Sequence, residues 1–129
     1  MTTRFHLFST VLGFALLAGV LTAQVTLKRG AVVYHGSAAN TTAPATIDEK
    51  KVREATVEWQ TIESEGIDLK SARGKQLVQK MNQRVREAVK SVATDESRDL
   101  VVRKNDIADD QGREVVDLTD EVVSKLEED

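Results

Sequence analysis

The last third of the chain decides the fold. It contains DLVV (residues 99–102) and, after a polar interval, VDLTDEVVSKL (residues 116–126). The first segment is apolar and rich in β-branched valine, which is typical of a buried strand, and we predict a strand over residues 98–104. A polar turn is expected through residues 106–112, followed by a short strand over 113–116.

The second segment predicts a capped C-terminal helix. Thr119 is placed to act as its N-cap, and Asp120 and Glu121 put negative charge at the positive end of the helix dipole. Leu118 can pack against Val123 as a hydrophobic staple. We therefore expect a helix that begins at Thr119 and ends near residue 126.

Upstream, two apolar stripes with helical spacing predict a helical hairpin. Thr46 and Glu49 have the spacing of a capping box, and they open a helix that is expected to end near Ser64. Glu65-Gly66 supplies a turn, and a second helix begins between residues 68 and 71 and runs to residue 93. Such narrow stripes favour an antiparallel, coiled-coil-like pair. The stripes consist of Val52, Ala55, Trp59 and Ile62 in the first helix, and of Val78, Met81, Val85, Ala88 and Val92 in the second.

The first 45 residues contain an export signal, a strand and a linker. Arg4 is the only charged residue before Lys28, and residues 7–18 are apolar, which resembles a secretory signal peptide that would be cleaved after Ala23. Uncleaved, residues 8–27 would be long enough to span a bilayer, which takes about 20 residues. A buried soluble helix is the third interpretation. Residues 25–35 predict a strand that is kinked at Arg29-Gly30, and residues 36–45 predict a linker.

Together these elements predict an α+β fold. A small three-stranded sheet would form an oligomerisation body, with a projecting antiparallel helical hairpin as an arm and a short C-terminal helix. The expected organisation is a signal peptide or membrane anchor (1–23), a first strand and linker (24–45), the hairpin arm (46–93), and the β body with the C-terminal helix (94–129). So small a sheet leaves exposed edges, and 129 residues bury only a modest core, so pairing between copies is expected.

Charge is distributed unevenly, although the net charge is only −3. Residues 69–93 carry seven basic side chains against one acidic side chain, whereas residues 94–129 carry thirteen acids against five bases. A basic helix on an acidic body could attract negatively charged partners or a membrane surface, although an ordinary solvated helix face is equally compatible with the pattern. The basic residues are Lys70, Arg73, Lys75, Lys80, Arg84, Arg86 and Lys90.

The sequence offers no constellation for catalysis, and we predict a protein that is not an enzyme and needs no metal or other cofactor. Cysteine is absent, and the two histidines are His6 and His35, with no serine placed to form a triad around the latter. The acids of residues 106–114 miss the spacing of a calcium-binding loop. Nucleic acid is not expected as a partner, because no aromatic residues are interleaved with the basic ones.

The order of long helix, DLVV strand, variable turn and VDLTDEVV helix resembles the C-terminal end of the Skp/OmpH family of periplasmic chaperones, over residues 76–126. The chain departs from that family in its short arm and acidic balance. The resemblance implies a homotrimer whose β body carries helical arms that hold unfolded outer-membrane proteins without ATP. It also implies periplasmic localisation, and an oligomer body that includes Val32, Val33, Leu100, Val101, Val102 and Val116.

Two functions remain open on this evidence. In the first, one edge of the apolar stripes stays open for unfolded clients, with contacts from Val52, Trp59, Ile62, Met81 and Val85. The simpler interpretation of the same stripes is that they form the core of the hairpin. In the second function, an uncleaved N-terminal helix tethers a structural or scaffolding protein of the envelope, and the hairpin binds one folded partner.

Overall fold

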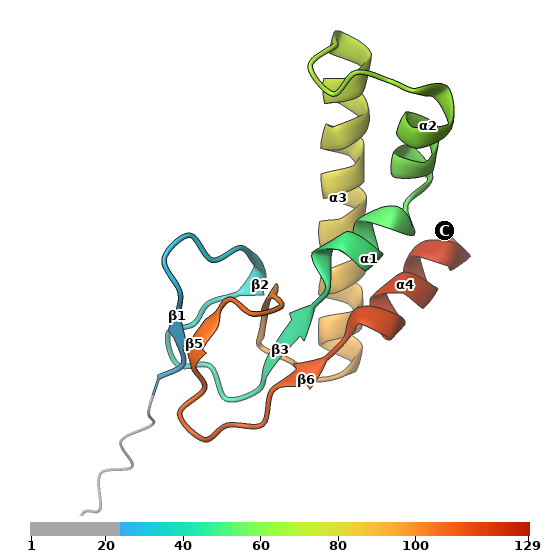
Figure 1. Cartoon of the computed structure of the whole chain (residues 1–129). Coiled ribbons are helices and arrows are strands. Elements are labelled where there is room, and N and C mark those ends of the chain that lie inside the picture. Colours follow the sequence, from blue (N-terminus) through green and yellow to red (C-terminus); the bar gives the residue numbers. More distant parts are fainter. Residues whose placement is uncertain (1–23) are drawn as a thin grey trace, which may run out of the picture.

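A computed structural model describes residues 24–129, and it confirms the α+β class (Figure 1). The predicted signal peptide or anchor lies outside the described residues. The strands are β1 Thr26–Leu27, β2 Val33–Gly36, β3 Pro44–Ile47, β4 Leu100–Arg103, β5 Ile107–Asp109 and β6 Val116–Asp117. The helices are α1 Glu49–Glu54, α2 Val57–Glu65, α3 Ala72–Asp95 and α4 Thr119–Glu128.

The main sheet has four strands in the order β2-β4-β3-β6, and the predicted three-stranded sheet is therefore wrong. Strand β4 is antiparallel to β2 and parallel to β3, and β3 is in turn parallel to β6. The helices α1 to α3 form the crossover that parallel pairing of β3 with β4 requires. Strands β1 and β5 make a separate antiparallel pair, so part of the predicted polar turn is strand β5.

The first predicted helix begins too early, because residues 44–47 are a strand. Ala45 pairs with Val101 on one side and with Val116 on the other, and Ala45 and Ile47 are fully buried. A strand with a partner on each edge is stabilised by two ladders of hydrogen bonds, which outweigh the local capping signal of Thr46. Asp48 is the N-cap instead, and its side chain accepts a hydrogen bond from the Lys51 amide. The linker that was predicted over residues 36–45 therefore ends before Pro44, where β3 begins.

A break at Ala55-Thr56 divides the first predicted helix into α1 and α2. Thr56 has an extended backbone, and its hydroxyl accepts a hydrogen bond from the Trp59 amide at 3.3 Å and donates one to the Arg53 carbonyl at 2.6 Å. The hydroxyl thus caps the start of α2 and also contacts the end of α1. The turn that follows α2 is confirmed: Gly66 ends the helix in the left-handed conformation, which glycine adopts at little cost.

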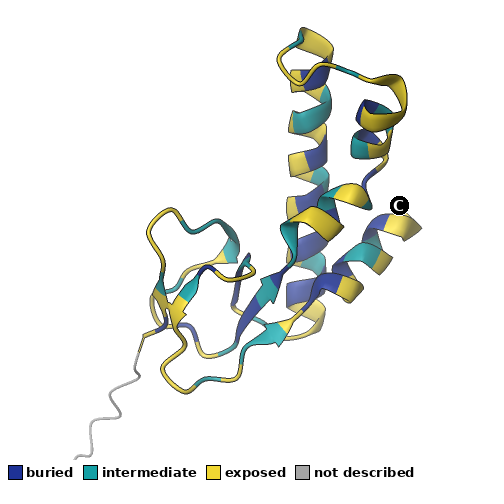
Figure 2. Cartoon of the chain, in the orientation of Figure 1, coloured by how far each residue is buried: buried dark blue, intermediate teal, exposed yellow. Residues whose placement is uncertain are grey.

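Helix α3 crosses the whole molecule, and its two halves have different surroundings. Its N-terminal half extends away from the sheet beside α2, while its C-terminal half lies against α4 (Figure 1). Val89 and Val92 of the C-terminal half share a core with Ile47, Val101 and Val122 from the sheet and α4. Figure 2 shows buried segments, in dark blue, on the lower part of α3, on β3 and on the start of α4. A coiled-coil arm separate from the body is therefore not confirmed.

The C-terminal helix is confirmed, with acidic Asp120 and Glu121 in its first turn, but its predicted N-cap is wrong. Thr119 is the first helical residue, and Leu118 at the N-cap position makes no capping hydrogen bond. The Asp117 carboxylate accepts a hydrogen bond from the Thr119 amide at 2.9 Å. The Thr119 hydroxyl instead donates to the Asp117 carboxylate at 2.5 Å and accepts from the Asp48 amide at 2.8 Å. This residue therefore connects the start of α4 to the start of α1.

The single kinked strand predicted over residues 25–35 is instead two strands, β1 and β2, which belong to different sheets. A turn at Gly30, which has a φ of +79°, separates them. Asp106 begins the polar stretch that follows β4, but it is buried. It accepts a hydrogen bond from the Val32 amide at 2.9 Å and forms an ion pair with Arg103 at 3.0 Å. The carboxylate therefore ties the β1–β2 turn to the end of β4.

Candidate functional site

An apolar pocket lies where α1 and α2 face α3 and β2. Its cavity volume is about 270 Å³. Its lining combines valine and methionine side chains of α3, which we call its floor, with polar groups of β2, α1, α2 and α3, which we call its walls. The lining residues are Tyr34, Glu49, Val52, Arg53, Trp59, Leu69, Val78, Met81, Asn82 and Val85.

The break between α1 and α2 builds one wall of this pocket. Because the chain turns at Thr56, the Trp59 side chain of α2 comes back over the end of α1, and the Arg53 guanidinium lies 4.5 Å from the centre of the indole ring. At this distance a cation is attracted to the face of the ring. An uninterrupted helix would place residues 53 and 59 on different faces, so the break creates this contact.

Three polar atoms of the pocket walls are buried without a hydrogen bond: Arg53 Nε, Trp59 Nε1 and Glu49 Oε2. Native proteins pair the great majority of such atoms, because a buried and unpaired polar group costs free energy. Glu49 Oε2 has partial compensation, because Arg103 Nη1 lies 3.6 Å away. The two N–H groups have no such compensation in the part of the chain that the structure describes.

The far wall is formed by Tyr34 of β2. Burial of the phenol and the nearby negative charge of Glu49 raise its pKa above the ordinary value of 10. The Arg86 guanidinium lies 5.9 Å from the centre of the tyrosine ring. Tyr34 is therefore a neutral hydroxyl at physiological pH, in a wall that also carries positive charge.

Four of the five predicted client-contact residues line this pocket: Val52, Trp59, Met81 and Val85. Ile62 is buried elsewhere along α2. Val52, Met81 and Val85 belong to the main core, and Trp59 is only partly buried against it. Most of each apolar stripe is thus covered within the chain, and the open part is limited to the pocket and its rim.

Sequence reasoning missed the polar and rim residues of the pocket, namely Tyr34, Glu49, Arg53, Leu69 and Asn82. Tyr34 is distant from the helices in sequence, and only the pairing of β2 with β4 brings it there. The contact between Arg53 and Trp59 could have been predicted from Thr56, because a threonine between two helical segments can act as an internal N-cap.

The predicted basic face of α3 is divided into two flanks by helical geometry. Arg73, Lys80 and Arg84 are spaced by seven and four residues and share one side, while Lys75, Arg86 and Lys90 share another. The first flank faces α2, where Arg73 pairs with Glu65 at 2.7 Å and Arg84 pairs with Glu58 at 3.0 Å. Lys70 lies in the loop before α3 and is exposed.

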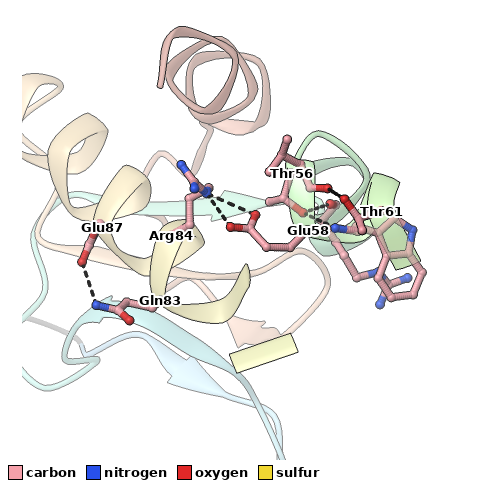
Figure 3. Close-up of polar contacts among 9 residues, drawn as sticks. Thr56, Glu58, Thr61, Gln83, Arg84 and Glu87 are labelled. Carbon is pink, nitrogen blue, oxygen red and sulfur yellow. Dashed lines mark hydrogen bonds and ion pairs between the residues drawn. The ribbon is translucent and has the colours of Figure 1, made fainter. Parts of the chain in front are cut away.

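The pair of Arg84 and Glu58 is the most buried ion pair within residues 24–129. The Glu58 side chain is 5% exposed, and both of its oxygens accept from Arg84 Nε, at 3.0 and 3.1 Å (Figure 3). The pair lines a polar groove of about 580 Å³ between α2, α3 and the end of α4. The groove lacks the positive field that was expected of helix α3, because its acidic and basic lining residues are equal in number. The acids are Glu58, Glu87 and Asp129, and the bases are Lys80, Arg84 and Lys125.

The predicted oligomer body is mostly inside the single chain. Leu100, Val101 and Val102 of β4 are fully buried, because β4 is an inner strand with covered faces. Val32, Val33 and Val116 are partly exposed. Val33 and Val116 lie in β2 and β6, the two edge strands of the sheet.

Comparison with known proteins identifies no relative. No family model matches the chain, no curated protein matches it, and no solved structure matches it. Within residues 24–129, none of the helices has the length and apolar character needed to cross a membrane.

Proposed function

We propose that this protein is an ATP-independent holdase, similar to the Skp/OmpH chaperones, that binds unfolded envelope proteins in the periplasm. One observation carries the proposal: an apolar pocket lies open beside the part of α2 and α3 that extends from the sheet. Exposed Leu69 (46%) at the pocket and exposed Val57 (59%) at the start of α2 add apolar surface at which an unfolded chain could be held.

The basic flank formed by Lys75, Arg86 and Lys90 supports a role in attracting acidic clients. These three side chains are exposed, and none has an ion pair with a carboxylate of residues 24–129. Arg86 also stands beside the pocket, over Tyr34. Positive charge at the entrance to an apolar pocket raises the rate of encounter with acidic polypeptides more than it raises affinity.

The proposal is tested by diluting a urea-unfolded outer-membrane β-barrel protein into buffer and following light scattering. We expect the purified protein, without ATP, to slow aggregation when present in several-fold excess. A non-chaperone protein of similar acidity serves as the control at equal mass. If the protein gives no more protection than that control, the holdase proposal is wrong.

The dependence on salt separates the electrostatic contribution to client protection from the apolar contribution. Screening at high ionic strength should weaken protection of an acidic client and leave protection of a basic client little changed. A double variant, Lys75→Gln with Lys90→Gln, should reproduce the effect of salt. Replacement of Lys28 and Lys104, which are exposed on the sheet side, is the matched control.

We also propose that the protein assembles as a homotrimer through its sheet edges. β2 and β6 are the outer strands of the four-stranded sheet, and edge strands offer unpaired backbone groups to another chain. Sedimentation equilibrium should give three times the monomer mass. A monomer mass at micromolar concentration would contradict this assembly, although it would not affect the pocket.

The scaffolding alternative differs from the holdase proposal in keeping the N-terminal segment uncleaved. Mass spectrometry of the protein from its host should find a chain that begins at Gln24 if the export signal is cleaved. An intact N-terminus in the membrane fraction would favour a tethered scaffold.

A further inference from the structure

The pocket contains two buried N–H groups that have no acceptor. Arg53 Nε and Trp59 Nε1 stand on the same wall, because the guanidinium is stacked on the indole ring. Each unpaired donor costs free energy that an acceptor oxygen in the pocket would recover. The two donors on this wall therefore lack hydrogen-bond partners when the pocket is empty, and they favour a ligand that carries an acceptor oxygen.

The charges around the pocket favour an acidic oxygen over a neutral one. Of the two charged residues that line the pocket, Glu49 lies 3.6 Å from Arg103, whereas Arg53 has no carboxylate partner within residues 24–129. Arg53 is thus the charged group of the lining that lacks a counter-ion. Hydrogen bonds from a charged donor to a carboxylate are about twice as strong as bonds between neutral groups.

The size and floor of the pocket limit the remainder of the ligand. A cavity of about 270 Å³ is below the range of roughly 300–1,000 Å³ that holds drug-sized ligands and cofactors. Its floor is formed by Val78, Met81 and Val85. A single apolar side chain suits this space, and the flexible thioether of Met81 can adapt to its shape.

From these features we propose that the pocket binds the C-terminal residue of a polypeptide whose last side chain is apolar. The side chain enters between Val78, Met81 and Val85, and the terminal carboxylate pairs with Arg53 and the indole N–H of Trp59. The last amide N–H donates to Glu49 Oε2. The inference rests on the proposed binding of polypeptides, which it narrows to one kind of chain end.

Binding requires small movements of Arg53, Trp59 and Glu49, because the atoms assigned to the ligand are all buried in the empty pocket. The Nε atom of Arg53 is one of them, so the side chain must rotate for the guanidinium to meet a carboxylate. The Arg53 guanidinium stacks on Trp59, and no ion pair within residues 24–129 restrains it. Side-chain rotations of this kind are common at binding sites and are fast.

Trp59 allows a direct test, because it is the only tryptophan of the chain. N-acetyl-leucine and N-acetyl-leucinamide present the same side chain, with and without a terminal carboxylate, and neither absorbs at the excitation wavelength of tryptophan. We expect both to change the fluorescence of Trp59. The acid should bind about tenfold more tightly than the amide, with a dissociation constant of about a millimolar for so small a probe.

Variants of Arg53 test whether its guanidinium causes the preference for the acid over the amide. Arg53→Gln should abolish the difference between acid and amide, and Arg53→Lys should retain part of it, because the charge remains while Nε is lost. Arg29→Gln removes the same charge from the exposed β1–β2 turn and should leave the ratio unchanged. Circular dichroism and thermal melting of each variant check that the fold is intact.

Four outcomes would overturn the proposal. Equal binding of acid and amide would show that the pocket does not select a chain end. Binding of N-acetylglycine as tight as that of N-acetyl-leucine would exclude the apolar subsite, and tighter binding of octanoate would make the pocket a fatty-acid site. An acid preference that persists in Arg53→Gln would place the carboxylate elsewhere. If Arg53→Gln loses the preference but still slows aggregation, the holdase proposal stands without this recognition step.

Discussion

Asp99 shows how one side chain can organise a loop. Its carboxylate accepts hydrogen bonds from the Thr41 hydroxyl, from the hydroxyl and amide of Thr42, and from the amide of Ala43 at 3.0 Å. These bonds fix the segment that leads into β3 against the start of β4. Desolvation of Asp99 opposes ionisation, but the four hydrogen bonds outweigh it and lower the pKa from 3.8 to about 2.

We predict that Asp99→Asn destabilises the protein by about 1 kcal/mol at pH 7, a modest value because the residue is exposed and solvent weakens its interactions. The folded-state pKa is the lower one, so the contribution is fully present above pH 4 and is lost as the pH falls towards 2. Urea unfolding of both proteins should show a difference at pH 7 that shrinks below pH 4. A constant difference across this range would contradict the assignment.

At the scale of the elements, Thr56 decides that one apolar stripe becomes two helices. Replacement by alanine should destabilise the protein by about 1 kcal/mol, because the cap of α2 and the bond to the Arg53 carbonyl are both lost. Thr61 is the matched control, since its hydroxyl bonds to the Val57 carbonyl within the same helix (Figure 3). Thr61→Ala should change the free energy of unfolding by less than about 0.5 kcal/mol.

The ion pair between Glu58 and Arg84 fixes α2 against α3. Glu58→Ala should cost about 1–3 kcal/mol, because a nearly buried charge-assisted hydrogen bond is removed from one side of the interface. Glu54→Ala removes the same side chain from an exposed pair with Lys50 at 3.9 Å, and it should change stability by no more than about 0.5 kcal/mol. Thermal melting of the two variants, measured side by side, provides the comparison. Equal effects would mean that the buried pair contributes nothing beyond helix propensity.

At the scale of the whole molecule, the C-terminal segment completes a core that begins at residue 45. Leu118 is buried between β6 and α4, and its amide donates to the Thr46 carbonyl at 2.9 Å. It lies in the same cluster as Met81 and Val85, which also line the pocket. The sheet and the helices are therefore expected to unfold together.

Leu118→Ala should cost about 2–5 kcal/mol through the cavity that it leaves, whereas Leu69→Ala, at the exposed pocket rim, should cost less than about 0.5 kcal/mol. Unfolding of the wild type should give the same midpoint by Trp59 fluorescence and by far-ultraviolet circular dichroism, since one core connects both regions. Separate midpoints would show that the α2–α3 pair unfolds as an independent unit.

The candidate site was only partly predictable. The apolar floor was expected from the helical spacing of Met81 and Val85. The polar wall was not, because Arg53 meets Trp59 only through the break at Thr56, and Tyr34 arrives from a strand some 50 residues before that part of α3. The seven basic residues were predicted as one face, and the acids of α2 then paired with two of them.

The sequence by itself determined the α+β class, the strand at 100–103, the turn at Gly66, the start of α3 and the position of α4. These features depend on short-range signals, such as a side chain that bonds to a backbone group within three residues, or on apolar spacing within one element. Only the tertiary structure decided that residues 44–47 are a strand and that Thr119 bonds to Asp48. In both cases the deciding partners are more than 50 residues away in sequence, and their hydrogen bonds outweigh the local preference.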